Sequence, residues 1–144
     1  MAITNFYNHT SRLHQEGAIA DTDTLRVALY SSLTFDETHT TKAAVDGAAT
    51  ELSTANGYTA GGQAIANLAA NTDPADDSQL DGDPTTWNAT GAGISAAYAL
   101  VYKDDGVDDP PLFIIDFQGT ESAGAGTPFT INWDATGILR IDVA

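Results

Sequence analysis

The fold is decided by residues 85–118, which read TTWNATGAGISAAYALVYKDDGVDDPPLFIIDFQ. Within this stretch, side chains alternate in character along residues 94–103 and again along residues 112–118. Successive side chains of a β-strand leave opposite faces of the sheet, so this period of two predicts two strands. The residues between them begin Asp-Asp-Gly, a sequence typical of turns. We therefore expect an antiparallel hairpin, the most apolar one in the chain.

The alternation also predicts which side chains share a face of this hairpin. The face expected for the first strand carries Ile94, Ala96, Tyr98, Leu100 and Tyr102, and that for the second carries Phe113, Ile115 and Phe117. Shorter alternating runs occur at residues 25–31, 129–133 and 139–143. Together they predict a core made of Leu25, Val27, Leu29, Trp87, Tyr98, Leu100, Phe113, Ile115, Phe117, Ile131 and Leu139.

The remaining segments are expected to cover this hairpin. Residues 5–17 have helical spacing, with Thr4 or Asn5 as the N-cap and Gly17 after the last turn. A short helix is expected within 42–52, a strand at 63–69, and loops at 73–84 and 119–127. The predicted fold is a mainly β single domain over residues 1–144. It is an antiparallel β-sandwich, or an open barrel, with one N-terminal α-helix.

Composition excludes several classes of protein. The net charge is −15, from 20 acidic and 5 basic residues. Such a charge repels phosphate, so we expect neither a nucleic-acid partner nor binding to an anionic membrane. No apolar run approaches the ~20 residues that cross a bilayer, and no signal peptide is expected. The chain has no cysteine, which excludes disulfides and thiolate metal sites.

The sequence contains no recognisable catalytic motif. There is no Gly-x-Ser-x-Gly elbow, and the two Gly-Ala-Gly segments lack the further residues of nucleotide-binding loops. The three histidines lack metal-ligand spacing, so we expect all of them to be surface residues. We therefore predict no catalytic residue, no cofactor and no enzymatic activity. An acidic hydrolase is the remaining enzymatic alternative, and only scattered carboxylates support it.

Carboxylates are the one abundant reactive group. Calcium takes several oxygen ligands from a compact loop, and two loops are rich in Asp. The candidate metal ligands are Asp76, Asp77, Asp81 and Asp83, and a second group is Asp104, Asp105, Asp108 and Asp109. Neither loop has the EF-hand pattern, so we interpret both as solvated turns without metal.

The order of sequence blocks resembles a family of small virion structural proteins of tailed bacteriophages. After the N-terminal helix come DTLRVAL (23–29), GYTAGG (57–62), TW (86–87), AYALVYK (97–103), PLFIIDF (111–117), FTINW (129–133) and GIL (137–139). The resemblance implies a capsid decoration (cement) protein, or a tail-associated virion component, without catalytic residues. Residues 36–55 and 73–83 are elaborated relative to that pattern.

We therefore expect a decoration protein on the outer surface of a phage capsid, where it stabilises the head shell. The expected partner is the major capsid protein, with a homo-oligomer on the shell as a further possibility. Attachment is expected through apolar residues of the N-terminal segment or of residues 36–55. The alternative is a tail- or fibre-associated module that binds a sugar or a receptor.

Overall fold

The structure is a computed structural model that describes residues 3–72, 78–135 and 137–141. Its strands form three antiparallel sheets. The main sheet consists of β1 (Ile3–Phe6), β9 (Pro111–Ala123), β8 (Ile94–Lys103), β2 (Leu25–Leu33) and β3 (Ala49–Glu51), with β4 (Gln63–Ala64) also paired to β2. A second sheet pairs β10 (Pro128–Ile131) with β7 (Thr85–Asn88), and a third joins β11 (Leu139–Ile141), β6 (Ser78–Asp81) and β5 (Ala69–Thr72). The helices are α1 (His9–Gln15) and α2 (Lys42–Asp46).

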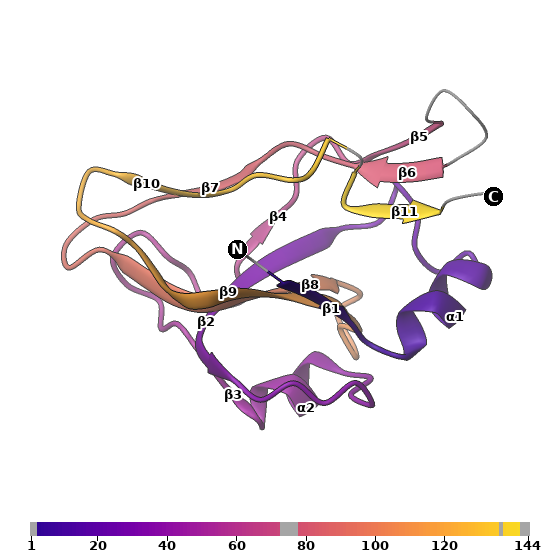
Figure 1. Cartoon of the computed structure of the whole chain (residues 1–144), viewed down its shortest axis with the longest axis horizontal. Coiled ribbons are helices and arrows are strands. Elements are labelled where there is room, and N and C mark those ends of the chain that lie inside the picture. The colour runs from indigo at the N-terminus through magenta and orange to yellow at the C-terminus, as the bar shows by residue number, and fades with distance from the viewer. Residues whose placement is uncertain (1–2, 73–77, 136, 142–144) are drawn as a thin grey trace.

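The elements are arranged in layers around the main sheet. Figure 1 shows the two small sheets on one side of the main sheet and α2 on the other, with α1 at one end. The predicted fold class, mainly β with antiparallel sheets and an N-terminal helix, is confirmed.

The predicted hairpin is present as β8 and β9, but its pairing is irregular. Residues 94–96 pair with 121–123, whereas 98–101 pair with 113–116. One residue of β8 therefore stands opposite four residues of β9, and we call residues 117–120 the β9 bulge. The backbone of Gln118 there has φ 60°, and its N–H donates to Asp116 Oδ1 at 2.8 Å. This hydrogen bond stabilises a conformation that is costly for a residue other than glycine.

The irregular pairing corrects the predicted faces of β8. Ile94 and Ala96 lie in one buried cluster, whereas Tyr98, Leu100 and Tyr102 lie in or against another. The single face predicted for these five residues is wrong, because a strict period of two does not continue past the β9 bulge. Ala99 and Val101 instead lie in the same buried cluster as Ile94 and Ala96.

Two hydrophobic clusters therefore flank the main sheet. The first cluster lies towards the small sheets, and its members include Leu25, Val27, Leu29, Tyr58, Trp87, Leu112, Phe113, Phe129 and Ile131. The second cluster lies on the opposite face and consists of Tyr7, Ala28, Tyr30, Leu33, Val45, Leu100, Tyr102 and Ile114. Of the predicted core, Tyr98 and Leu100 belong with the second cluster, while Ile115, Phe117 and Leu139 are only half-buried against the first.

The N-terminal segment differs from the predicted helix over residues 5–17. Residues Ile3–Phe6 form β1, which pairs with β9 from Asp116 to Phe113, and α1 begins only at His9. Neither Thr4 nor Asn5 caps the helix; the N-cap is Asn8, whose side chain makes no cap hydrogen bond. Gly17 follows the helix with φ 69°, which is the conformation expected for a glycine there.

Other boundaries also shift. The helix expected within 42–52 is α2 followed by β3, because the chain leaves the helix at Gly47 to pair with β2. The strand expected at 63–69 is divided between β4 and β5. In the expected loop 73–84, residues 78–81 form β6, while 73–77 lie outside the described residues. The expected loop 119–127 is shorter, because β9 continues to Ala123.

Candidate functional site

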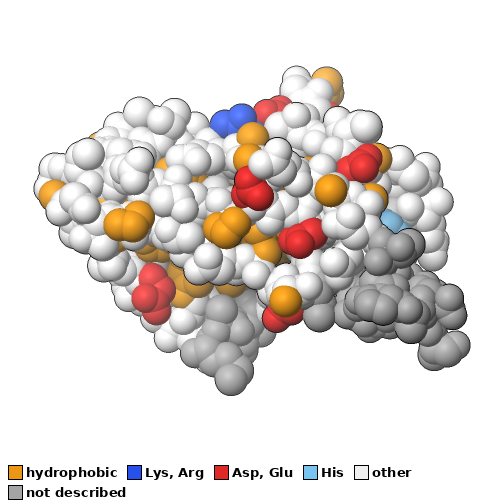
Figure 2. Space-filling model, turned by 90° about the horizontal axis from the view of Figure 1, so that it is seen from above, with side chains coloured by type: hydrophobic (Ala, Val, Ile, Leu, Met, Phe, Trp, Pro, Cys, Tyr) orange, Lys and Arg blue, Asp and Glu red, His pale blue; other side chains and the backbone are white. Residues whose placement is uncertain are grey.

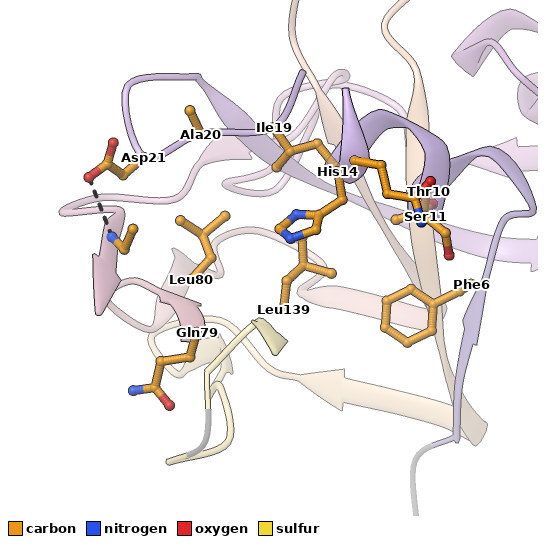
Figure 3. Close-up of a pocket in the computed structure, with 12 residues that line it drawn as sticks. Phe6, Thr10, Ser11, His14, Ile19, Ala20, Asp21, Gln79, Leu80 and Leu139 are labelled. Carbon is orange, nitrogen blue, oxygen red and sulfur yellow. Dashed lines mark hydrogen bonds between the residues drawn. The ribbon is translucent and has the colours of Figure 1, made fainter. Parts of the chain in front are cut away.

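A pocket of about 400 Å³ opens between α1, the segment after it and the third sheet (Figure 3). We call it the N-terminal pocket. Its lining comprises Phe6, Thr10, Ser11, His14, Gln15, Ile19, Ala20, Asp21, Ala70, Gln79, Leu80 and Leu139. Figure 3 shows the His14 ring in the middle of these residues, directed towards Leu80 and Leu139.

The lining of the N-terminal pocket is apolar at its floor and polar at its rim. Ile19 and Leu80 are buried members of the first cluster, whereas the Phe6 side chain is 49% exposed. The Thr10 hydroxyl donates to the backbone oxygen of Leu112 at 2.6 Å, and Asp21 Oδ2 accepts from the N–H of Ala70 at 3.4 Å. These two polar groups therefore already hold the fold together. The pocket is suited to bind an apolar group rather than to transfer a proton.

A second hollow of about 560 Å³ lies between β9 and β10, and we call it the β9–β10 seam. Its lining comprises Ile115, Phe117, Glu121, Ser122, Ala123, Pro128, Phe129, Thr130, Ile131 and Asn132. The rings of Phe117 and Phe129 lie 6.2 Å apart across it. This hollow was not predicted from the sequence, although both strands that line it were expected.

The charges of the chain are unevenly distributed. Residues 84–102 and 122–133 contain no acidic or basic residue, although the chain as a whole carries 20 acidic and 5 basic ones. These residues include β7, β10 and most of β8. Figure 2, viewed onto the small sheets, shows broad uncharged areas between a few separated acidic side chains. We call β7, β10 and their connecting loops the uncharged end.

The Asp-rich turn between β8 and β9 is closed by its own hydrogen bonds. Asp105 Oδ1 accepts from the N–H groups of Val107, Asp108 and Asp109 at 2.9–3.0 Å. Asp109 Oδ1 in turn accepts from the N–H groups of Asp105 and Gly106. The N–H groups of Asp109, Val107 and Asp108 hold the pKa of the Asp105 carboxyl below its ordinary value. These oxygens are engaged by backbone donors, which favours the interpretation of a turn.

The other proposed metal ligands are only partly described. Asp81 Oδ1 accepts from the N–H of Gly82 at 2.8 Å, and Asp83 Oδ2 accepts from Asn67 Nδ2 at 2.6 Å. Asp76 and Asp77 lie outside the described residues. Within the part of the chain that the structure describes, no three His, Cys, Asp or Glu side chains come together as metal ligands.

The three histidines have different surroundings, and the prediction that all lie on the surface is wrong for His9. Its side chain is buried, and Nε2 bonds to the backbone oxygen of Pro111. His39 Nε2 lies 3.8 Å from Asp36 Oδ2, and His14 lines the N-terminal pocket. His9 is buried because β1 pairs with β9, and this pairing places the start of α1 against the main sheet.

A polar cluster around Lys42 was not predicted from the sequence. Lys42 Nζ donates to Asp46 Oδ2 at 2.8 Å and to Glu51 Oε2 at 2.9 Å, and lies 5.6 Å from the Tyr102 ring centroid. Glu51 Oε1 also accepts from the Tyr58 hydroxyl at 2.7 Å. Burial alone lowers the pKa of Lys42, but its hydrogen bonds to the two carboxylates outweigh burial and raise it. We call this set the Lys42 cluster.

The Lys42 cluster has a structural role. Its members come from α2, β3, β8 and the segment before β4, so it ties these elements together. Tyr102 belongs to the second cluster and Tyr58 to the first. Only the i, i+4 spacing of Lys42 and Asp46 was visible in the sequence. The contribution of Glu51 depends on the antiparallel pairing of β2 with β3, which has no local signal.

Comparisons of the chain with protein-family models, with curated proteins and with solved structures found no match. Neither described helix is long and apolar enough to cross a membrane. The site must therefore be interpreted from its own geometry. That geometry offers one mainly apolar pocket and one hollow of mixed polar and apolar lining rather than a catalytic arrangement of described side chains.

Proposed function

We propose that this protein is a non-enzymatic virion component that decorates the outer surface of a tailed-phage capsid. Phe6 is the observation that carries the proposal: a large aromatic side chain on the N-terminal segment, 49% exposed at the rim of an apolar pocket. An exposed aromatic beside a pocket is a typical anchor for a protein partner. The ordered blocks that resemble virion structural proteins supply the class of partner, the major capsid protein.

The charge of the chain supports a position outside the shell. A protein of net charge −15 on the inside would face packaged DNA of the same sign. On the outside, the acidic surface faces solvent and keeps particles apart. Each copy needs only a modest contact, because many symmetric sites add their small stabilisations.

The two segments expected to provide attachment differ in what they expose. The N-terminal segment offers Phe6 and the pocket behind it. In residues 36–55, Val45 is 1% exposed and Leu52 is half-buried against the first cluster. The apolar side chains of that segment are therefore used within the protein, and we assign attachment to the N-terminal pocket.

The test uses phage particles made without this gene. We expect heads to assemble but to rupture at lower temperature or under milder osmotic shock, and added purified protein to restore their resistance. The Phe6→Ala protein should restore less at equal concentration. Val107→Ala is the matched control, because Val107 is the other large hydrophobic residue that is exposed among the described side chains, at 85%, and lies in the turn between β8 and β9.

A tail- or fibre-associated binding module is the second candidate. Its specific support is the lining of the N-terminal pocket, which combines the Ser11 hydroxyl, the His14 imidazole and the Gln15 amide with the Phe6 ring, groups suited to a sugar. In that case, particles without the gene would adsorb poorly while their heads resist rupture normally. That result would overturn the decoration proposal.

A further inference from the structure

We propose that Thr85 and Trp87 bind a buried water molecule in the layer between the second sheet and the main sheet. The water accepts a hydrogen bond from Trp87 Nε1 and forms another with Thr85 Oγ1. This site is separate from the N-terminal pocket and from the β9–β10 seam. The inference therefore goes beyond capsid decoration and is tested without phage particles.

The first observation is a pair of buried polar atoms that lack a protein partner. Thr85 is 3% exposed and Trp87 is 1% exposed. Thr85 Oγ1 and Trp87 Nε1 are both shielded from solvent, and neither forms a hydrogen bond with any described residue. The large majority of buried side-chain polar atoms in proteins bind protein or ordered water, because an unsatisfied one destabilises the fold. Two such atoms on one short strand therefore indicate a polar ligand between them.

The second observation is that both atoms belong to the same face of β7. Side chains two residues apart in a strand leave the same face, and here Thr85 and Trp87 are buried whereas Thr86 and Asn88 are exposed. Residues two apart in a strand are separated by about 6.6 Å along the chain. One water, with hydrogen bonds of about 2.9 Å to each partner, spans polar atoms up to about 5.8 Å apart. The spacing along β7 thus suits a single bridging water.

The surroundings of the two side chains limit the size of the ligand. In the register of the second sheet, Thr85 lies opposite Ile131 and Trp87 lies opposite Phe129. All four side chains are buried, and neither Thr85 nor Trp87 is among the described residues that line the two hollows. Thr85 has the smallest of the four side chains, so the layer is filled least beside its hydroxyl group. A molecule of the size of water fits there without displacing the aromatic rings.

The chemistry of the two atoms selects water over an ion. Trp87 Nε1 only donates hydrogen bonds, whereas the Thr85 hydroxyl both donates and accepts. The donor at Trp87 disfavours a cation. An anion would lack a counter-charge, because residues 84–102 and 122–133 contain no Lys or Arg. Water satisfies both atoms, and buried waters occur about once per 27 residues in globular proteins.

The experiment is a high-resolution crystal structure of the full chain, with NMR of the labelled chain as the check in solution. We expect density for a water within about 3.2 Å of both Trp87 Nε1 and Thr85 Oγ1. In solution, the indole proton of Trp87 should show cross-peaks to water with opposite signs in NOE and ROE spectra, which distinguishes a bound water from proton exchange. The only other tryptophan is Trp133, so Trp133→Phe assigns the two indole signals.

A matched pair of variants measures what the water contributes. Thr85→Val keeps the shape of the side chain but removes the hydroxyl, so the water loses one partner. We expect a melting temperature roughly 3 °C lower than that of Thr86→Val, the effect of losing one buried hydrogen bond. Thr86→Val is the control because it makes the same chemical change on the exposed face of β7, where the hydroxyl bonds to Thr130 Oγ1 at 2.9 Å.

Two outcomes would overturn the proposal. One is a crystal structure in which Trp87 Nε1 and Thr85 Oγ1 share no water, whether they bond to protein atoms or to nothing. The other is a melting temperature of Thr85→Val equal to or above that of Thr86→Val. That result would mean that the Thr85 hydroxyl is unsatisfied, because an apolar group of the same shape then replaces it without loss.

Discussion

The two faces of the main sheet are stabilised in different ways. The first cluster is almost entirely apolar around Trp87, and both hollows are lined by its members. The second cluster contains three tyrosines, and neither hollow is lined by any of its residues. The hydroxyl of Tyr30 donates to Asp46 Oδ1, and that of Tyr102 to the backbone oxygen of Gly61, both at 2.6 Å. Two of the three tyrosines thus add directional hydrogen bonds to the second cluster. In the first cluster Tyr58 does the same through Glu51, and the openings lie beside apolar members of that cluster.

The largest expected effect tests the centre of the first cluster. Trp87 is 1% exposed, and its ring contacts those of Tyr58 and Phe129. Trp87→Ala should lower the free energy of unfolding by ~3–5 kcal/mol, because it removes a large buried side chain and leaves a cavity. Urea denaturation measures this loss. Trp87→Phe, which keeps an aromatic ring there, should cost clearly less; equal losses would mean that the indole packing is unimportant.

A smaller effect tests the polar edge of the second cluster. Glu51→Gln removes the charge that faces Lys42 Nζ at 2.9 Å, where the Lys42 side chain is 13% exposed. We expect a loss of about 2 kcal/mol, because a largely buried ammonium loses one of its two carboxylate partners. Glu37→Gln, on an exposed side chain, is the control and should stay within about 0.5 kcal/mol. An unchanged unfolding midpoint for Glu51→Gln would show that the Lys42 cluster does not close this face.

Phe117 tests the boundary of the first cluster. Its full burial, as predicted from the sequence, would make Phe117→Ala cost ~3–5 kcal/mol. The structure places it half-buried at the β9–β10 seam, so we expect only about 1–2 kcal/mol. The comparison with Trp87→Ala is made under the same denaturing conditions. A loss equal to that of Trp87→Ala would mean that the seam is closed.

Burial of Tyr30 should make the stability of the second cluster depend on pH. Burial, and then the hydrogen bond to Asp46, raise the pKa of Tyr30 above its ordinary value. The unfolded chain releases this proton above about pH 10 and the folded chain does not, so this stability is present below pH 10 and falls above it. Tyr30→Phe should reduce the fall, by at most ~1.4 kcal/mol per pH unit for one proton. Denaturation midpoints at about pH 8 serve as the reference; parallel pH profiles of the two proteins would contradict the prediction.

The smallest expected effect concerns calcium, for which we predict no change. The described oxygens of Asp105 and Asp109 already accept backbone hydrogen bonds. Melting temperatures with calcium and with a chelator should therefore coincide. A site filled at about a hundredfold excess over its dissociation constant would add ~2.7 kcal/mol. A rise of several degrees would show that one of the Asp-rich loops binds the ion.

The sequence predicted elements whose signal is local. The alternation along β8, β9 and β10 was sufficient to place these strands, because a half-buried strand imprints its period on neighbouring residues. β1 was interpreted as the start of a helix, since only its register with Ile115 and Asp116, over a hundred residues away, makes it a strand. β6 was missed within an Asp-rich segment for the same reason.

The candidate sites could not be predicted in the same way. Phe6, Ile19, Leu80 and Leu139 meet in the N-terminal pocket from four distant segments, and no spacing in the sequence relates them. The seam depends on a bulge that shifts the register of β9 by three residues. Such a shift follows from tertiary packing and leaves no periodic trace.

The pairing of β1 with β9 also sets an order of events during synthesis. β1 leaves the ribosome before the other described strands, yet its partner residues 113–116 are made more than a hundred residues later. The Thr10 bond to Leu112 and the His9 bond to Pro111 must wait for the same segment. Such distant contacts form late, because a long loop must close before they stabilise anything. The N-terminal pocket around Phe6 is thus completed only late in folding, so a chain without residues 111–116 cannot form it.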